Sequence, residues 1–230
     1  MRRSLNKILR KIGYEIVRYS RFPSVLEQEL KNDPDFFFVQ IGANDGVRFD
    51  NLYNFVTNNN CKGLVVEPIK DYFERLALNY KDYPNIIPVN VAIHKEDKKA
   101  TIYRVDPKRL HELPVAVDGI ASFLPQHHQL MNTPSEYMIS EEVACMHLME
   151  MFDQYKVTKI NLLQIDTEGY DAEIIKLIDF ERIKPSIIKY EHHGISDQEE
   201  AELQSMLTKI GYEVFREHGG DSFAVRKPIN

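Results

Sequence analysis

Short apolar runs alternate with amphipathic segments along the chain from residue 34 onward. Short apolar runs between turn signals are typical of buried strands, and apolar residues repeating every three or four positions are typical of helices. The pattern predicts strands at residues 36–42, 63–68, 86–93, 100–105, 160–166 and 185–193. It predicts helices at residues 72–80, 170–180 and 198–210, and a partly helical segment at 143–155. Strands separated by helices favour a parallel sheet with helices on both faces.

The last two predicted strands, residues 212–217 and 222–227, are joined only by a short turn that contains Gly219 and Gly220. They must pair antiparallel, since parallel neighbours need a long crossover connection. A mostly parallel sheet that ends in an antiparallel hairpin resembles the Rossmann-like, seven-stranded sheet of class I methyltransferases. The predicted fold class is therefore α/β, with this sheet and with helices on both of its faces.

Two parts of the chain fall outside the alternation. Residues 1–33 form an N-terminal extension that begins with a basic amphipathic helix, because Leu5, Ile8, Leu9, Ile12 and Ile16 recur at helical spacing among Lys and Arg residues. This helix either packs on the core or contacts a membrane surface or a partner protein. Residues 34–230 form the predicted domain, with an insertion at about residues 106–141 that contains four prolines and has weak periodicity.

Composition narrows the function classes. A net charge of −6 and a pI of about 5.8 leave no global positive field for nucleic acid, so we expect no nucleic-acid partner. The two cysteines, Cys61 and Cys145, lack metal-ligand spacing and indicate reduced thiols. The chain has no apolar run of membrane-spanning length and no continuous apolar signal-peptide core. We therefore expect a cytoplasmic protein, with peripheral membrane contact only through the basic helix.

Polar residues follow each predicted strand, where ligands bind in open α/β sheets. Strand by strand, these candidates are Gly42 to Gly46, Glu67, Asn90 and Ala92, Asp166 and Glu168, and Glu191 to His193. The glycines let the backbone turn tightly and approach a ligand closely. Glu67, about twenty residues after the glycine-containing turn, is spaced to accept hydrogen bonds from both hydroxyls of a ribose.

The stretches that carry a family resemblance are VQIGANDG (39–46), LVVEP (64–68), NVAI (90–93), GIASF (119–123), LLQIDTEGYDAEIIK (162–176) and PSIIKYEHH (185–193). With these motifs the chain resembles the FkbM family of S-adenosylmethionine-dependent methyltransferases over roughly residues 36–225. The block IDTEG is the most specific of them. The resemblance implies a class I methyltransferase fold, methyl transfer to oxygen, and a hydroxyl of a sugar or glycolipid-linked glycan as acceptor.

Site roles also follow from this resemblance. It places Gly42, Asn44 and Gly46, with Ala43 and Asp45 in the same turn, around the methionine part of S-adenosylmethionine. It places Glu67 at the ribose and Asp166 beside the sulfonium, with Asn90, Ala92 and Ser122 as further neighbours of the cofactor. The sequence departs from the family at Gln40, where an acid is common, so that position offers no carboxylate to the cofactor's amino group.

The sequence alone does not decide which residue is the catalytic base or whether a metal ion takes part. A base that takes the acceptor's proton could be Asp166, Glu168, His192 or His193. Alternatively, Asp166, Glu191 and His192 gather around Mg²⁺, which would lower the pKa of the acceptor hydroxyl. A purely structural alternative is that Asp166 and Glu168 cap the helix that follows them.

The acceptor is expected to contact the insertion, since function concentrates on loops held by a rigid scaffold. Its candidate residues are His111, Phe123, His127, His128 and Tyr137. Two other function classes stay open. One is a nicotinamide-dependent oxidoreductase, although the chain lacks the GxGxxG fingerprint. The other is a non-catalytic module of the same fold, docked to a glycan-synthesis partner or to a membrane surface.

Overall fold

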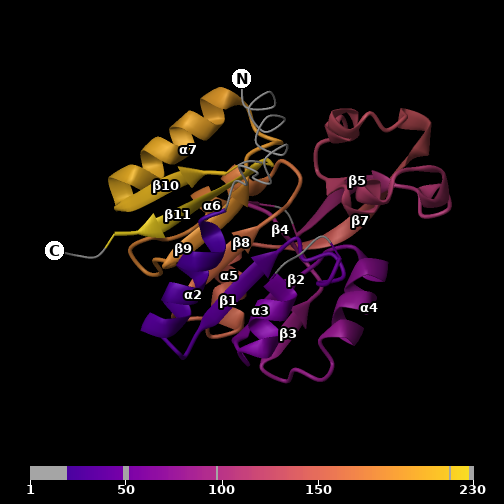
Figure 1. Cartoon of the computed structure of the whole chain (residues 1–230). Helices are drawn as coiled ribbons and strands as arrows, with labels where there is room; N and C mark the ends of the chain where they lie inside the picture. The colour runs from indigo at the N-terminus through magenta and orange to yellow at the C-terminus, as the bar shows by residue number, and fades with distance from the viewer. Residues whose placement is uncertain (1–19, 49–51, 97, 218, 228–230) are drawn as a thin grey trace, which may run out of the picture.

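The protein is described by a computed structural model that covers residues 20–48, 52–96, 98–217 and 219–227. Its centre is a seven-stranded sheet with the order β10-β11-β9-β8-β1-β2-β3 (Figure 1). All neighbouring strands are parallel except for β11, which runs antiparallel to both β9 and β10. The bounds are β1 Phe37–Ile41, β2 Lys62–Val66, β3 Ile86–Val89, β8 Leu162–Ile165, β9 Ile187–Glu191, β10 Tyr212–Arg216 and β11 Asp221–Arg226. The predicted fold class is confirmed, including the antiparallel hairpin at its end.

Helices cover both faces of this sheet and account for its two apolar cores. One core joins the odd-numbered side chains of β1, such as Val39, to the helices α5, α6 and α7. The other joins Phe38 of β1 to the helices α2, α3 and α4. Side chains alternate across a strand, so a strand buried on both faces is apolar throughout. The bounds are α2 Phe22–Asn32, α3 Leu52–Asn58, α4 Lys70–Asn79, α5 Leu148–Gln154, α6 Asp171–Lys176 and α7 Asp197–Ile210.

The register of the strands brings their carboxyl ends to one edge of the sheet. Ile41, the last residue of β1, pairs with Val66 on one side and with Ile165 on the other. Ile165 in turn pairs with Tyr190, the residue before Glu191. The polar residues that follow β1, β2, β8 and β9 therefore lie beside one another, as the sequence predicted.

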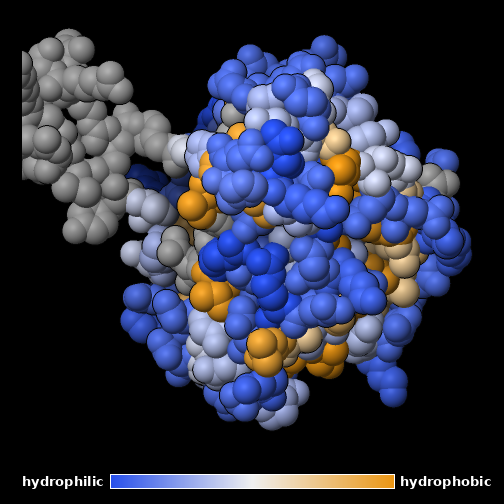
Figure 2. All heavy atoms as spheres, turned by 90° about the vertical axis from the view of Figure 1, so that its right-hand side faces the viewer, coloured by the Kyte–Doolittle hydropathy of each residue, from blue (hydrophilic) through white to orange (hydrophobic). Residues whose placement is uncertain are grey.

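A smaller, four-stranded sheet projects from the domain at the right of Figure 1, with the order β4-β7-β5-β6. It contains β4 (Ala92–Ile93), β5 (Lys99–Val105), β6 (Ala121–Ser122) and β7 (Met138–Met146). Four 3₁₀ turns lie between β5 and β7: η1 (Leu110–Glu112), η2 (Val115–Gly119), η3 (His127–Met131) and η4 (Ser135–Tyr137). On the face turned toward the viewer in Figure 2, the surface is mainly hydrophilic, with smaller separate apolar patches.

The structure corrects several predicted elements. The segment 86–93 is two strands in different sheets, because the chain leaves the main sheet after Val89. The start of segment 143–155 is strand, since β7 runs from Met138 to Met146, and the helix begins only at Leu148. The insertion at 106–141 is consequently irregular only up to residue 137. The helices α2 and α3 were not predicted.

The predicted basic helix lies outside the described residues, so the division into an extension and a domain stays a prediction. In the part of the chain that is described, no helix has both the length and the hydrophobicity needed to cross a bilayer.

Candidate active site

The turn after β1 touches the end of β8. Gly42 has a φ of +79°, and a Cβ added there would lie 1.7 Å from the backbone oxygen of Asp166. A side chain at this position is therefore excluded both by the backbone conformation and by a backbone atom that cannot move aside. The amides of Gly42 and Ala43 both donate to the carbonyl of Val66, at 3.0 Å each, and so join the turn to β2. The bare turn thus fits the ends of three strands together.

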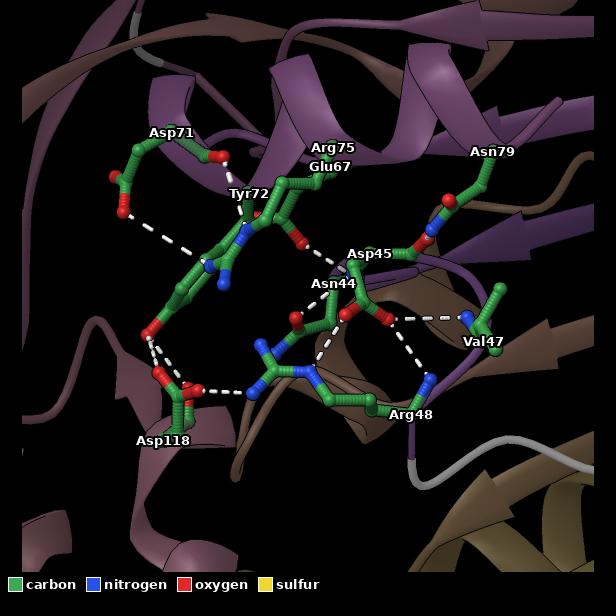
Figure 3. A network of polar contacts seen from close by, with 10 residues as sticks. All are labelled: Asn44, Asp45, Val47, Arg48, Glu67, Asp71, Tyr72, Arg75, Asn79 and Asp118. Atoms are coloured by element: carbon green, nitrogen blue, oxygen red, sulfur yellow. Dashed lines mark hydrogen bonds and ion pairs between the residues drawn. The ribbon is translucent and has the colours of Figure 1, made fainter. Parts of the chain in front are cut away.

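Glu67, directly after β2, holds the same turn from the other side. Its Oε2 accepts a hydrogen bond from the amide of Asn44 at 2.8 Å (Figure 3). Its Oε1 accepts one from the amide of Ile69, also at 2.8 Å. The residue is 4% exposed, and burial raises the pKa of its carboxyl group from 4.5 to about 7. Asn90 donates from Nδ2 to the carbonyl oxygens of Glu67 and Pro68, at 2.8 and 3.0 Å. Glu67 is therefore fixed in place, and Asn90 serves to support it.

A pocket opens where these elements meet. Its floor includes Gly42, Asn44, Glu67 and Asp166, and its walls include apolar residues around Ala92. Residues of the insertion cover it: Gly119, Ala121 and Phe123. The free interior amounts to about 50 Å³, whereas pockets that bury a small ligand are several times larger. The free interior is therefore smaller than the volume of a ligand of nucleoside size.

A network of charged groups links the turn after β1 to this cover (Figure 3). Asp45 accepts hydrogen bonds from the amides of Val47 and Arg48 and from Arg48 Nε, at 3.0, 2.8 and 2.6 Å. Arg48 also forms an ion pair with Asp118 of η2, which accepts a further hydrogen bond from the hydroxyl of Tyr72. Partial burial acts to raise the pKa of Asp45, but the hydrogen bonds from Arg48 and Val47 outweigh it and lower this pKa.

This network places two predicted cofactor residues away from the pocket. The carboxylate of Asp45 is engaged by Arg48, and Asp45 does not line the pocket. Gly46 has a φ of +76°, and an added Cβ would lie 2.6 Å from the side chains of Leu76 and Tyr80. Gly46 is therefore required for packing against α4 and does not line the pocket, and its contact with the cofactor stays a prediction.

Three carboxylates gather at the ends of β8 and β9. One oxygen from each of Asp166, Glu168 and Glu191 lies within 4.8 Å of the other two. Asp166 remains open to solvent in the pocket, yet the surrounding protein, followed by the charges of Asp171 and Glu168, raises its pKa well above the usual value. Burial, followed by the charges of Glu168 and Asp166, raises the pKa of Glu191 to about 9. Among the described residues, Glu191 Oε2 has no hydrogen-bond partner.

Asp171, a residue that the sequence did not single out, organises this loop. It is fully buried and accepts hydrogen bonds from the amide and the hydroxyl of Thr167, at 3.1 and 2.7 Å, and from the amide of Glu191, at 2.9 Å. It thereby ties the end of β8 to the end of β9. Asp171, and not Asp166 or Glu168, therefore has the structural role at the start of α6. Asp166 and Glu168 line the pocket. The sequence feature that could have indicated this contact is Thr167, which stands four residues before Asp171.

Glu168 is held by the insertion. Its φ is +55°, which is uncommon for a residue other than Gly. Ser122 donates to its carbonyl oxygen at 2.6 Å, and Nε2 of His127 lies 2.6 Å from its Oε2. Ser122 is buried, is bonded to Glu168 and does not line the pocket, so its contact with the cofactor stays a prediction.

The paired histidines after β9 do not join the three carboxylates. His192 is buried, its Nδ1 lies 3.0 Å from the hydroxyl of Ser222, and its Nε2 accepts a hydrogen bond from Arg216 Nε at 3.1 Å. Burial lowers the pKa of His192. Both ring nitrogens face the hairpin β10–β11, so the structure does not bring the ring of His192 together with the three carboxylates. His193 is exposed and lies beside Gly220.

Of the insertion residues expected to contact an acceptor, only Phe123 lines the pocket. Its ring packs edge-on against His94 and Tyr170, at centroid distances of 5.4 and 5.1 Å. His128 is bonded within the insertion, to the carbonyl of Pro125 and the hydroxyl of Ser135. His111 and Tyr137 lie near Glu112 of η1 and are not pocket residues.

The comparison with protein families now adds to this geometry. The family model described as the methyltransferase FkbM domain matches residues 40–219, which is most of the chain and includes every pocket residue. The chain belongs to the FkbM methyltransferase family. This confirms the resemblance, and this FkbM protein is accordingly a methyltransferase with an S-adenosylmethionine-dependent class I fold. It also removes the nicotinamide-dependent oxidoreductase from consideration.

Solved structures give more distant likenesses to this FkbM protein. The precorrin-6y C5,15-methyltransferase of Geobacter metallireducens has 13% sequence identity and a TM-score of 0.42, and the match covers 91% of this chain and 88% of that one. The N-terminal domain of human METTL16, in complex with SAH, has 13% identity and a TM-score of 0.47, with 97% and 79% covered. No curated protein gives a match. These likenesses carry no indication of the acceptor.

Proposed function

We propose that this FkbM protein transfers a methyl group from S-adenosylmethionine to a hydroxyl oxygen of a sugar or glycan. The observation that carries the proposal is the position of three carboxylates, at Asp166, Glu168 and Glu191, next to the floor made by Gly42 and Glu67. A proton acceptor and a cofactor cradle thus share one pocket. Proton removal from a hydroxyl is what distinguishes methyl transfer to oxygen from transfer to a more nucleophilic atom.

The residues of the floor fit the cofactor. Each oxygen of Glu67 accepts one backbone hydrogen bond, which leaves further acceptor capacity on both for the two hydroxyls of a ribose. Gly42 lines the pocket beside Glu67 and has no side chain, so a ligand can lie against main-chain atoms there. When bound, the cofactor supplies an electrophilic methyl group. The protein's own task is to orient the acceptor hydroxyl and to take its proton.

The charge of the pocket favours a neutral, hydroxyl-rich acceptor. Asp166 and Glu168 line the pocket with carboxyl oxygens, which accept hydrogen bonds from hydroxyl groups, and an ionised carboxylate there repels phosphates. Phe123, on the wall beside Tyr170, offers an aromatic surface for the apolar face of a sugar ring. The same charges support the expectation that nucleic acid is not the acceptor.

The metal hypothesis is kept with a different set of ligands. Three clustered carboxylates match the hard oxygen ligands that Mg²⁺ takes, and they would be Asp166, Glu168 and Glu191, without His192. An ion there would supply positive charge that lowers the pKa of a bound hydroxyl. The cytoplasmic location and the contact of the basic helix with a membrane or partner remain proposals from the sequence.

The test is a methyl-transfer assay with radiolabelled S-adenosylmethionine and a panel of neutral sugars, glycans and lipid-linked glycans, with Mg²⁺ and with EDTA. We expect label in at least one neutral glycan and none in sugar phosphates or RNA. Transfer only to an anionic acceptor would contradict the charge argument. Cofactor binding without transfer to any acceptor would favour the non-catalytic module. Equal rates with Mg²⁺ and with EDTA would remove the metal.

A further inference from the structure

Glu168 adopts a strained backbone conformation that needs support from other residues. A left-handed backbone at a residue other than Gly is unfavourable, and it persists only where surrounding contacts impose it. At Glu168, with a φ of +55°, both supporting contacts come from the insertion. Ser122 holds the carbonyl oxygen and His127 holds the carboxylate, each at 2.6 Å. The insertion therefore sets where this carboxylate lies.

His127 has little freedom to serve another partner. Its side chain is 4% exposed. Its ring rests on two glycines, because a Cβ at Gly194 would lie 3.1 Å from Cε1 and one at Gly169 would lie 3.4 Å from Nδ1. A Cβ at Gly194 would be closer to the ring than is usual, and one at Gly169 would be in ordinary contact with it. Residues 127, 169 and 194, from three segments of the chain, thus lie close together at the contact between His127 and Glu168.

Glu168 still faces the pocket. Its side chain is 24% accessible, and the residue lines the same pocket as Gly42 and Glu67. Asp166 and Glu191 are its acidic neighbours in the cluster, and Glu191 does not line the pocket. The carboxylate of Glu168 thus combines access to the pocket with a position fixed by a second side chain, that of His127.

We propose that Glu168 is the catalytic base and that His127 is a positioning residue that acts through it. This inference rests on the proposed function. In the step, the acceptor's O–H bond breaks and its electron pair forms the new O–CH₃ bond. The S–CH₃ bond breaks with its electron pair left on sulfur, and the proton passes to the carboxylate of Glu168. Nε2 of His127 stays hydrogen-bonded to Oε2 throughout and keeps the carboxylate aimed at the acceptor.

The test uses variants of the full chain, assayed with the acceptor found in the glycan panel. Glu168→Gln should lower kcat by about 10²- to 10⁴-fold, the usual contribution of a general base. His127→Phe should lower kcat by about tenfold or more, while the Kd for S-adenosylhomocysteine stays within twofold of wild type. His127→Gln keeps a side-chain N–H donor and should restore most of the lost rate. The double variant should be no slower than Glu168→Gln alone, because His127 acts only through Glu168.

His128→Phe is the matched control. His128 is equally buried in the same turn but is bonded to Pro125 and Ser135 and not to Glu168. It should keep kcat near the wild-type value. If His128→Phe loses as much activity as His127→Phe, or if the double variant multiplies the two single losses, the positioning role is wrong and the insertion matters only as a folded unit.

A second readout needs no acceptor and separates this inference from the proposed function. In protein labelled with ¹⁵N-histidine, Glu168→Gln should shift the Nε2 resonance of His127 and leave that of His128 in place. An unchanged His127 resonance would overturn the inference even if methyl transfer is observed. A shifted resonance without transfer to any acceptor would keep the contact and overturn the catalytic role together with the proposed function.

Discussion

At the scale of single residues, Glu67 carries the strongest expectation for the cofactor. Its carboxylate is buried and is fixed by two amides, so a ligand hydroxyl finds acceptors already in position. Glu67→Gln keeps the shape and removes the charge, and it should weaken S-adenosylhomocysteine binding by about 1–3 kcal/mol, or roughly tenfold to a hundredfold in Kd. Calorimetry checks this, with Glu74→Gln on the exposed side of α4 as control. An unchanged Kd in folded Glu67→Gln would refute the role.

The same residue predicts a pH dependence. The pKa of Glu67 is raised to about 7, so below that pH one oxygen carries a proton and ceases to accept hydrogen bonds freely. The affinity for S-adenosylhomocysteine should therefore rise between about pH 6 and pH 8 and then level off. Titrations across this range in wild type and Glu67→Gln provide the check. A slope that persists in the variant would assign the titration to another group.

At the scale of elements, the ion pair between Arg48 and Asp118 fastens the insertion over the pocket. Because the free interior is small, we expect the cover to open before a ligand enters. Arg48→Ala should speed hydrogen exchange at the amides of Val117 and Ile120 in and after η2 by about tenfold, since local opening becomes easier. Lys99→Ala, which removes an exposed ion pair between β5 and β7, is the control. Equal exchange in both variants would contradict the fastening.

Strands that are more deeply buried were easier to predict from the sequence. The central strands β1, β2 and β8 are almost wholly buried and are therefore mostly apolar runs in the sequence. Strand β7 was missed because only Val143 and Cys145 of its nine residues are buried, and its centre reads Ser140-Glu141-Glu142. Its partner β5 lies far from it along the chain, so their antiparallel pairing left no local signal.

Residues of the candidate site were likewise predictable where they directly follow a buried strand. Gly42, Glu67 and Asp166 directly follow apolar strands, and the edge of the sheet brings them together. His127 and Asp118 lie in an insertion without periodicity, and their contacts depend on how that insertion folds back over the sheet. The role of His192 could not be predicted for a different reason. The sequence placed it at the right edge but gave no sign that Ser222 and Arg216 would occupy its ring.

At the scale of the whole molecule, the acidic cluster should lower the stability of the folded protein. Glu191 ionises near 4.5 when unfolded and near about 9 in the fold, so between these values the folded state binds more protons. This residue therefore lowers stability as the pH rises. Glu191→Gln should be more stable than wild type, with an advantage that grows toward pH 9 to the order of 1–3 kcal/mol. Urea unfolding at several pH values tests this, with exposed Glu142→Gln as control. An advantage that does not change with pH would contradict it.

The central claim is that the carboxyl ends of β1, β2 and β8 form a cofactor site for S-adenosylmethionine. The most direct test is calorimetric titration of the purified protein with S-adenosylhomocysteine, with NAD as the control ligand. The account predicts saturable binding of one S-adenosylhomocysteine per chain and no binding of NAD. Binding of NAD, or binding of neither ligand by a well-folded sample, would contradict it.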